Sequence, residues 1–194
     1  MLTADASGHG VAAGLVMTMI KSQLFSLASE PHDAGDFFQR LNQCVRKLAP
    51  KNMFVTAAYV ALAQEASTAA AQIEFATVGH PPILHYSAAR DAVEELSTSA
   101  TALGMRATLT LKPRVTALQR DDVPLLYTDG ICEQMNPKKE QWGLERLKAE
   151  LQQHHHLPLA QLCDRIMRTG AAFRGNAAAH DDMTLVAIRR EAQV

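Results

Sequence analysis

The sequence predicts an α+β fold, in which helices and strands occupy separate stretches of the chain. Apolar residues recur at helical spacing in the N-terminal quarter and again after residue 143. The middle of the chain and its last part hold short runs rich in apolar and β-branched residues, which are typical of strands. Helices that are segregated from consecutive strands favour antiparallel sheets with helix layers over a doubly wound parallel sheet. We expect a single domain over residues 1–194.

The helices are predicted in four segments where large apolar residues recur every three or four positions: 11–29, 33–49, 143–153 and 159–173. Pro31 ends the first helix and Pro50 ends the second, because the residue before a proline avoids helical geometry. We expect the regularly spaced apolar residues of these two helices to form their buried faces. These are Val11, Leu15, Met19 and Leu27 in the first, flanked by Ala12, Val16 and Ile20, and Phe37, Leu41, Val45 and Leu48 in the second.

Strands are predicted in six segments that are bounded by turn residues: 54–63, 73–78, 83–86, 109–118, 123–128 and 183–188. An alanine-rich turn around 65–71 joins the first two. Pro113 interrupts the fourth, which we expect to remain one long strand. Residues 1–4 are too short for a strand with a preceding connection.

Charge and composition exclude several classes of protein. The formal net charge is −1 and the pI about 6.7, so the chain lacks the basic surface of a nucleic-acid-binding protein. No apolar run is long enough to cross a bilayer, and the N-terminus does not have the pattern of a secretion signal. The three widely spaced cysteines, Cys44, Cys132 and Cys163, fit reduced thiols in a cytoplasmic protein.

Three aspartates lie where a predicted strand or loop pattern changes. Asp5 precedes a small-residue loop that opens the first helix, Asp129 follows a strand, and Asp181 and its neighbour Asp182 precede the last strand. Carboxylates at strand ends can meet at one edge of a sheet, and their hard oxygens suit Mg²⁺ or Mn²⁺. Taken one at a time, each aspartate is better explained as a turn former.

Four motifs give these aspartates a shared context. The segments are DASGHG at 5–10, ATVGHPP at 76–82, LYTDGICE at 126–133 and HDDMTLV at 180–186. They occur in the order found in bacterial metal-dependent phosphatases of the PPM (PP2C-like) type, and the chain resembles the sporulation and stress-response members that act in partner switching. Asn136 and Trp142 follow the third motif as they do in that family.

The resemblance implies an α-β-β-α sandwich of two antiparallel sheets flanked by helix pairs. It also implies two Mn²⁺ or Mg²⁺ ions, with Asp5 bridging them, the carbonyl of Ala6 as a further ligand, and Asp129 and Asp181 completing one ion's shell. Asp182 is the alternative to Asp181. A metal-activated water would be the nucleophile, so no catalytic side chain needs to be found.

The implied function is hydrolysis of phosphoserine or phosphothreonine on a regulatory protein, such as an anti-sigma-factor antagonist. Relatives begin with a hairpin that resembles "GGDFYD", and we expect these first strands to be missing from this chain. The alternative to an enzyme is therefore a catalytically weak remnant that acts as a protein-interaction module.

The histidines carry less weight as ligands. His9 lies in a glycine-containing loop, where we expect a structural hydrogen bond, and His80, between Gly79 and two prolines, is interpreted as a turn residue. Adjacent side chains at a helix end cannot all face one ion, so His154, His155 and His156 are interpreted as a solvated helix terminus.

Overall fold

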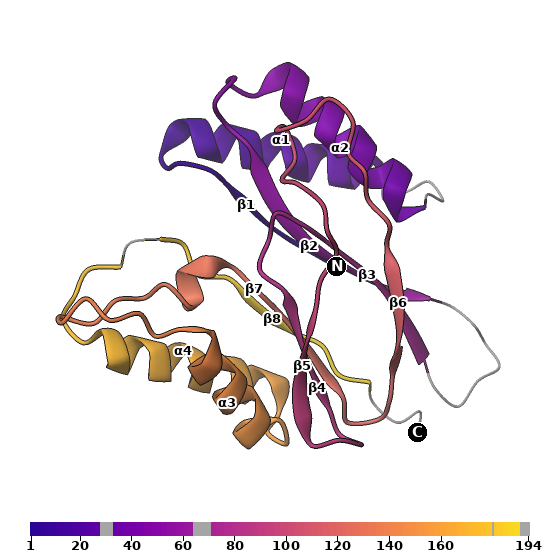
Figure 1. The fold of residues 1–194 in the computed structure, drawn as a ribbon. Coiled ribbons are helices and arrows are strands. Elements are labelled where there is room, and N and C mark those ends of the chain that lie inside the picture. Colours follow the sequence, from indigo (N-terminus) through magenta and orange to yellow (C-terminus); the bar gives the residue numbers. More distant parts are fainter. Residues whose placement is uncertain (28–32, 64–70, 180, 191–194) are drawn as a thin grey trace. The chain divides into compact units, whose positions relative to one another are not determined.

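The structure, a computed structural model, describes residues 1–27, 33–63, 71–179 and 181–190 (Figure 1). The chain forms two compact units, each containing a four-stranded sheet and a pair of helices. The first unit comprises Met1–Leu62, Glu74–His80 and Ser97–Thr116, and the second comprises Ala63–Ile73, Pro81–Leu96 and Ala117–Val194. The predicted fold class, α+β with antiparallel sheets and helix pairs, is confirmed. The predicted turn at 65–71 lies almost entirely outside the described residues.

The first unit is built on a sheet of strand order β1-β2-β3-β6. Its strands are β1 (Leu2–Ala6), β2 (Val55–Ala63), β3 (Ala71–Val78) and β6 (Arg114–Leu118). Two helices, α1 (Val11–Leu27) and α2 (Ala34–Leu48), cover one face of this sheet (Figure 1). The core between them is apolar and includes Val16, Ile20, Phe38, Leu41, Val45, Val55, Ala57, Ala76 and Val78.

The strand β1 corrects one expectation. Residues 1–4 were too short for a strand on sequence grounds, yet Leu2–Ala6 pairs antiparallel with β2 over five residues. The register runs from Leu2 opposite Tyr59 to Ala6 opposite Val55. β1 is an end strand of its sheet, so a single paired neighbour is enough to hold it in extended form.

The helix bounds were predicted well, but the buried faces were predicted only in part. Asp33 caps α2 by accepting a hydrogen bond from the Asp36 amide at 2.9 Å. In α2 the buried side chains include Leu41 and Val45 as expected, whereas Leu48 is 65% exposed.

The stripe predicted for α1 is mostly wrong. Its buried residues are Val16, Ile20 and Leu27, while Val11 and Leu15 are 82% and 61% exposed. α1 carries apolar residues on all sides, so spacing alone did not indicate which side faces the sheet.

The second unit is built on a sheet of order β5-β4-β7-β8. Its strands are β4 (Ile83–Ser87), β5 (Ala92–Leu96), β7 (Val123–Tyr127) and β8 (Leu185–Ala187), and its helices are α3 (Leu144–His154) and α4 (Leu159–Arg174). Leu125 of β7 lies opposite Leu84 on one side and Ala187 on the other, so β7 is fully paired. The core of this unit includes Tyr86, Val123, Leu125, Ile131, Trp142, Leu147, Leu151, Leu162 and Ile166.

Two strand predictions need correction. β5 was not predicted, because its two central residues are glutamates; it forms as the partner of β4 in a hairpin. The strand predicted over 109–118 is wrong in its first half, since β6 begins at Arg114, directly after Pro113. The Leu109 amide instead donates to Gln39 Oε1 of α2 at 2.9 Å. In the part of the chain that the structure describes, no helix is both long and apolar enough to span a bilayer.

Candidate metal centre

Asp129 is placed by the buried strand β7. The strand ends at Tyr127, and after the extended residue Thr128 the chain turns into a short 3-10 helix, η1 (Asp129–Ile131). The Asp129 carboxylate accepts a hydrogen bond from the Gly130 amide at 3.0 Å and is half-buried. A buried strand followed by a tight turn gives this side chain a well-defined position at the end of the sheet.

Asp181 is placed by a loop that is tied to the same strand end. The Thr128 hydroxyl donates to the Asp182 carbonyl at 3.1 Å and accepts from the Thr184 amide at 2.9 Å. The Thr128 amide also donates to the Thr184 carbonyl at 3.1 Å. Asp181 itself is exposed and accepts from the Asp182 amide at 2.8 Å. Thr128 therefore holds the 181–184 segment against the start of η1.

These two elements bring two carboxylates together. Asp129 and Asp181 each offer an oxygen, and the two oxygens lie within 4.8 Å of one another. Of the adjacent aspartates, Asp181 is the one that meets Asp129 among the described residues. Carboxylates at this separation repel unless a cation lies between them, and hard oxygens are the ligands that Mg²⁺ and Mn²⁺ prefer. The donor set therefore fits a divalent cation.

Gly130 makes this approach possible. A Cβ on Gly130 would stand 2.4 Å from the Asp182 carbonyl oxygen and 3.3 Å from the Asp181 Cβ. No side chain fits there without displacing the loop, so the glycine is required by close packing of backbone against backbone.

Asp5 and Ala6 belong to the first unit. They are the last two residues of β1, opposite Thr56 and Val55 of β2; Asp5 is half-buried and Ala6 is buried. A loop that includes Gly8 and Gly10, both with positive φ, leads from them to α1. Their participation in one metal site with Asp129 and Asp181 stays a prediction.

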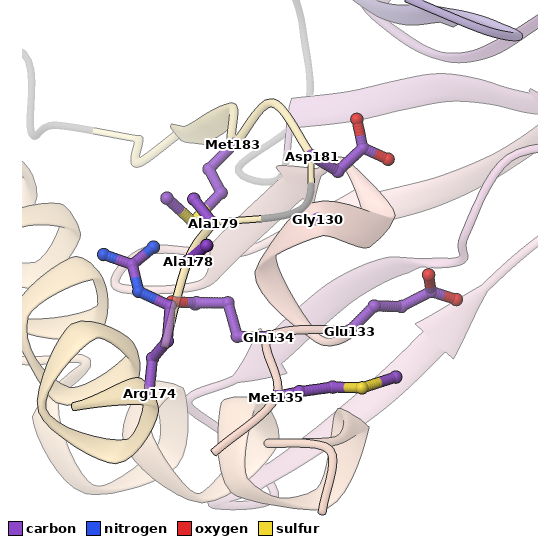
Figure 2. Close-up of a pocket in the computed structure, with 9 residues that line it drawn as sticks. All are labelled: Gly130, Glu133, Gln134, Met135, Arg174, Ala178, Ala179, Asp181 and Met183. Atoms are coloured by element: carbon purple, nitrogen blue, oxygen red, sulfur yellow. The ribbon is translucent and has the colours of Figure 1, made fainter. Parts of the chain in front are cut away.

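A cavity of about 180 Å³ is lined by Asp181 and by Gly130, the residue that follows Asp129 (Figure 2). Its walls are Gly130, Glu133, Gln134, Met135, Arg174, Ala178, Ala179, Asp181 and Met183. Sequence reasoning assigned no role to Gln134 or Arg174. Arg174 is the last residue of α4, and a basic residue is common at the C-terminal end of a helix. Nothing in the sequence therefore indicated that Arg174 lines a cavity.

Cys132 is the thiol nearest to Asp129 in sequence. Burial raises the pKa of this thiol to about 12, although a hydrogen bond with Tyr127 acts in the opposite direction. Burial also raises the pKa of the Tyr127 hydroxyl. Cys132 is therefore protonated at neutral pH and is not a ready nucleophile.

His80 lies between β3 and β4, as expected of a turn residue, whereas His154 and His155 are half-buried rather than fully solvated. His80 is buried, and its Nδ1 lies 2.8 Å from the Thr56 hydroxyl. The ring of His155 stacks on Tyr86 at 3.9 Å, whereas His154 lies beside Glu150. Within the described residues, these rings form no metal-ligand group.

Comparison with known proteins agrees with the fold. The chain is 27% identical to the phosphoserine phosphatase RsbU of Bacillus subtilis (strain 168) over 190 residues, which is 97% of this chain and 54% of RsbU. It therefore spans about half the length of this curated relative. The SiaA-PP2C domain of Pseudomonas aeruginosa matches with a TM-score of 0.80 at 22% identity, covering 98% of this chain and 74% of that domain.

A further solved structure is the catalytic domain of the serine threonine protein phosphatase PstP, in complex with two manganese ions. It matches with a TM-score of 0.66 at 14% identity, covering 96% of this chain and 85% of that one. These structural likenesses show a shared PP2C fold. The sequence also matches the family of the stage II sporulation protein E (SpoIIE) over residues 1–191. The chain belongs to the SpoIIE family.

Proposed function

We propose that this chain is a metal-dependent protein phosphatase, and that Asp129 and Asp181 hold a divalent cation at its active site. The observation that carries the proposal is the approach of these two carboxylates to within 4.8 Å. They come from segments more than 50 residues apart, and Thr128 joins those segments by three hydrogen bonds. An arrangement held this firmly is expected of a ligand pair rather than of two turn-forming aspartates.

Asp5 and the Ala6 carbonyl complete the proposed ligand set. Asp5 would bridge two cations, as its place in the DASGHG motif implies. The two manganese ions of PstP, which shares the fold, support a site for two divalent cations. Oxygen ligands alone accommodate both Mn²⁺ and Mg²⁺, and we propose that either ion occupies the site.

In the proposed reaction, the chain's own residues position the divalent cations and balance part of their charge. Divalent cations supply positive charge to the phosphoryl oxygens and make a water molecule more acidic. Asp129 and Asp181 fix where that charge lies, and the tied loop keeps them there. The protonated Cys132 thiol is not suited to attack phosphorus, which fits a reaction without a covalent enzyme intermediate.

The proposed substrate is phosphoserine or phosphothreonine on a small regulatory protein of the anti-sigma-factor antagonist type. The support is the relationship to RsbU, which is named a phosphoserine phosphatase, and the partner-switching resemblance of the four motifs. We propose a cytoplasmic location for this activity, in keeping with three free, half-buried cysteines.

Turnover of p-nitrophenyl phosphate and of a phosphoserine protein tests the proposal. We expect activity with added Mn²⁺ and none in excess chelator, and Asp129→Asn should lower the rate by about a hundredfold or more. The matched control is Asp121→Asn. Asp121 is an exposed turn residue with φ 65°, a left-handed backbone conformation that asparagine also adopts readily. Absence of turnover in the wild-type chain with Mn²⁺ would instead indicate a non-catalytic interaction module.

A further inference from the structure

The cavity that Asp181 lines contains buried polar atoms that lack hydrogen-bond partners among the described residues. Nε and Nη1 of Arg174 and Oε1 of Gln134 are buried, and none of them has a hydrogen-bond partner among the described residues. Both side chains line the same cavity, and Figure 2 shows them pointing toward one another. Figure 2 also shows the carboxylates of Glu133 and Asp181 directed to the other side, away from the guanidinium.

The orientation of Gln134 is determined by its surroundings. Its Nε2 donates to the Ile131 carbonyl at 3.1 Å, which leaves Oε1 as the atom that needs a donor. Gly170 of α4 leaves room for this amide, because a Cβ there would stand 2.5 Å from Gln134 Nε2. The cavity therefore presents two fixed donors on Arg174 and one fixed acceptor on Gln134.

Arg174 is half-buried, but its Nε and Nη1 are shielded from solvent, and burying these N–H groups is costly unless an anion or hydrogen bonds offset their desolvation. The cavity volume of about 180 Å³ is several times the roughly 30 Å³ that one water occupies in the liquid. It has room for a small oxyanion with accompanying water. Each buried N–H group of the guanidinium can donate a charge-assisted hydrogen bond to an oxygen of such an ion or of its water.

We propose that Arg174 and Gln134 form a binding subsite for inorganic phosphate. A phosphate oxygen would accept from one of the two buried N–H groups of Arg174, with water accepting from the other, and the P–OH of hydrogen phosphate would donate to Gln134 Oε1. A carboxylate satisfies the arginine but has no proton for Gln134, so the donor pattern favours phosphate. The functional interpretation of this subsite rests on the proposed function, because phosphate is the product of phosphatase activity. Asp181 belongs both to the proposed metal site and to the wall of this cavity.

Phosphate binding is measured in the Asp129→Asn/Asp181→Asn background. This background cannot hold the proposed metal and does not repel an anion, so the outcome is independent of phosphatase activity. Isothermal titration with inorganic phosphate should give saturable binding in the millimolar range. Adding Arg174→Gln should weaken it by about tenfold or more, and Arg174→Lys should fall between, because lysine keeps the charge but not the N–H groups of the guanidinium.

Arg168→Gln is the matched control, since Arg168 is an exposed arginine on the same helix and should leave phosphate affinity unchanged. Urea unfolding of each variant establishes that it is folded. The proposal is overturned if the background protein binds no phosphate, or if Arg174→Gln, while folded, binds it equally well. It is also overturned if acetate binds as tightly as phosphate with the same dependence on Arg174.

Discussion

The carbonyl oxygen of Asp182 lies so close to Gly130 that a methyl group on this glycine would stand 2.4 Å away from it. The contact presses the loop that carries Asp181 against the turn that carries Asp129. The relative position of the two carboxylates therefore depends on a residue that has no side chain.

Gly130→Ala is expected to displace that loop and weaken Mn²⁺ binding by about tenfold or more, with a stability loss of about 1–3 kcal/mol from overpacking. Titration calorimetry with Mn²⁺ and urea unfolding measure the two effects. Gly14→Ala is the control, because Gly14 is an exposed position in α1 with nothing near its missing Cβ. It should raise stability by up to about 1 kcal/mol and leave Mn²⁺ affinity unchanged. Equal Mn²⁺ affinities of wild type and Gly130→Ala would contradict the role assigned to this contact.

Thr128→Val should separate the loop from the strand end without changing side-chain shape. The Thr184 amide would lose its acceptor and the Asp182 carbonyl its donor, at a cost of about 1–3 kcal/mol. We expect Mn²⁺ affinity to fall as well. Thr128→Ser keeps the hydroxyl and should retain most of both properties. If the valine and serine variants bind Mn²⁺ alike, the hydroxyl does not position the loop.

Asp122→Ala should destabilise the second unit. The buried Asp122 carboxylate accepts from the amides of Ala88 and Gln119 at 2.9 and 2.8 Å, and lies 3.2 Å from His85 Nε2. Removing it leaves the buried His85 ring and two part-buried amides without their acceptor, so we expect a loss of about 3–5 kcal/mol in urea unfolding. Asp122→Asn keeps one acceptor oxygen and should lose less. If the free energy of unfolding falls by less than the roughly 0.5 kcal/mol of an ordinary surface substitution, these hydrogen bonds of Asp122 do not stabilise the second unit.

Stability should fall at alkaline pH because two buried groups resist ionisation. Burial raises the pKa of Cys132 from its ordinary 9.0 to about 12 and also raises the pKa of Tyr127. The stabilisation is fully present below pH 9, where the thiol is protonated in both folded and unfolded chains. It is lost as pH rises toward 12, because the unfolded thiol ionises first. Urea midpoints across this range should fall less steeply for Cys132→Ser, whose hydroxyl does not titrate; an unchanged slope would rule out this contribution.

Much of the fold could be predicted because local signals and tertiary packing agree. α2 begins at the cap Asp33 and ends before Pro50, so both of its ends are encoded by adjacent residues. β7 is buried on both sides, and its continuous apolar run is unmistakable. β5 is different, because Glu94 and Glu95 conceal a strand that exists only through pairing with β4.

Some residues of the candidate site could likewise be predicted from local sequence, and others could not. Asp129 and Asp181 were identified because each stands in a motif and beside a strand. Arg174 and Gln134 lie 40 residues apart in sequence, and only the packing of α4 beside the turn after β7 brings them to one cavity. Side chains that meet through tertiary contacts, without a motif of their own, leave no local signal in the sequence.

The central claim is that Asp181, and not its neighbour, holds a divalent cation together with Asp129. The most direct test is Mn²⁺ affinity, measured by titration calorimetry on Asp181→Asn and Asp182→Asn. Both changes remove one charge from adjacent positions in the same loop, but it is Asp181 whose carboxylate oxygen is grouped with that of Asp129, within 4.8 Å. The account predicts that Asp181→Asn weakens Mn²⁺ binding by about a hundredfold, as expected for a lost ligand, while Asp182→Asn changes it by less than about threefold. Equal losses in the two variants, or a larger loss in Asp182→Asn, would contradict it.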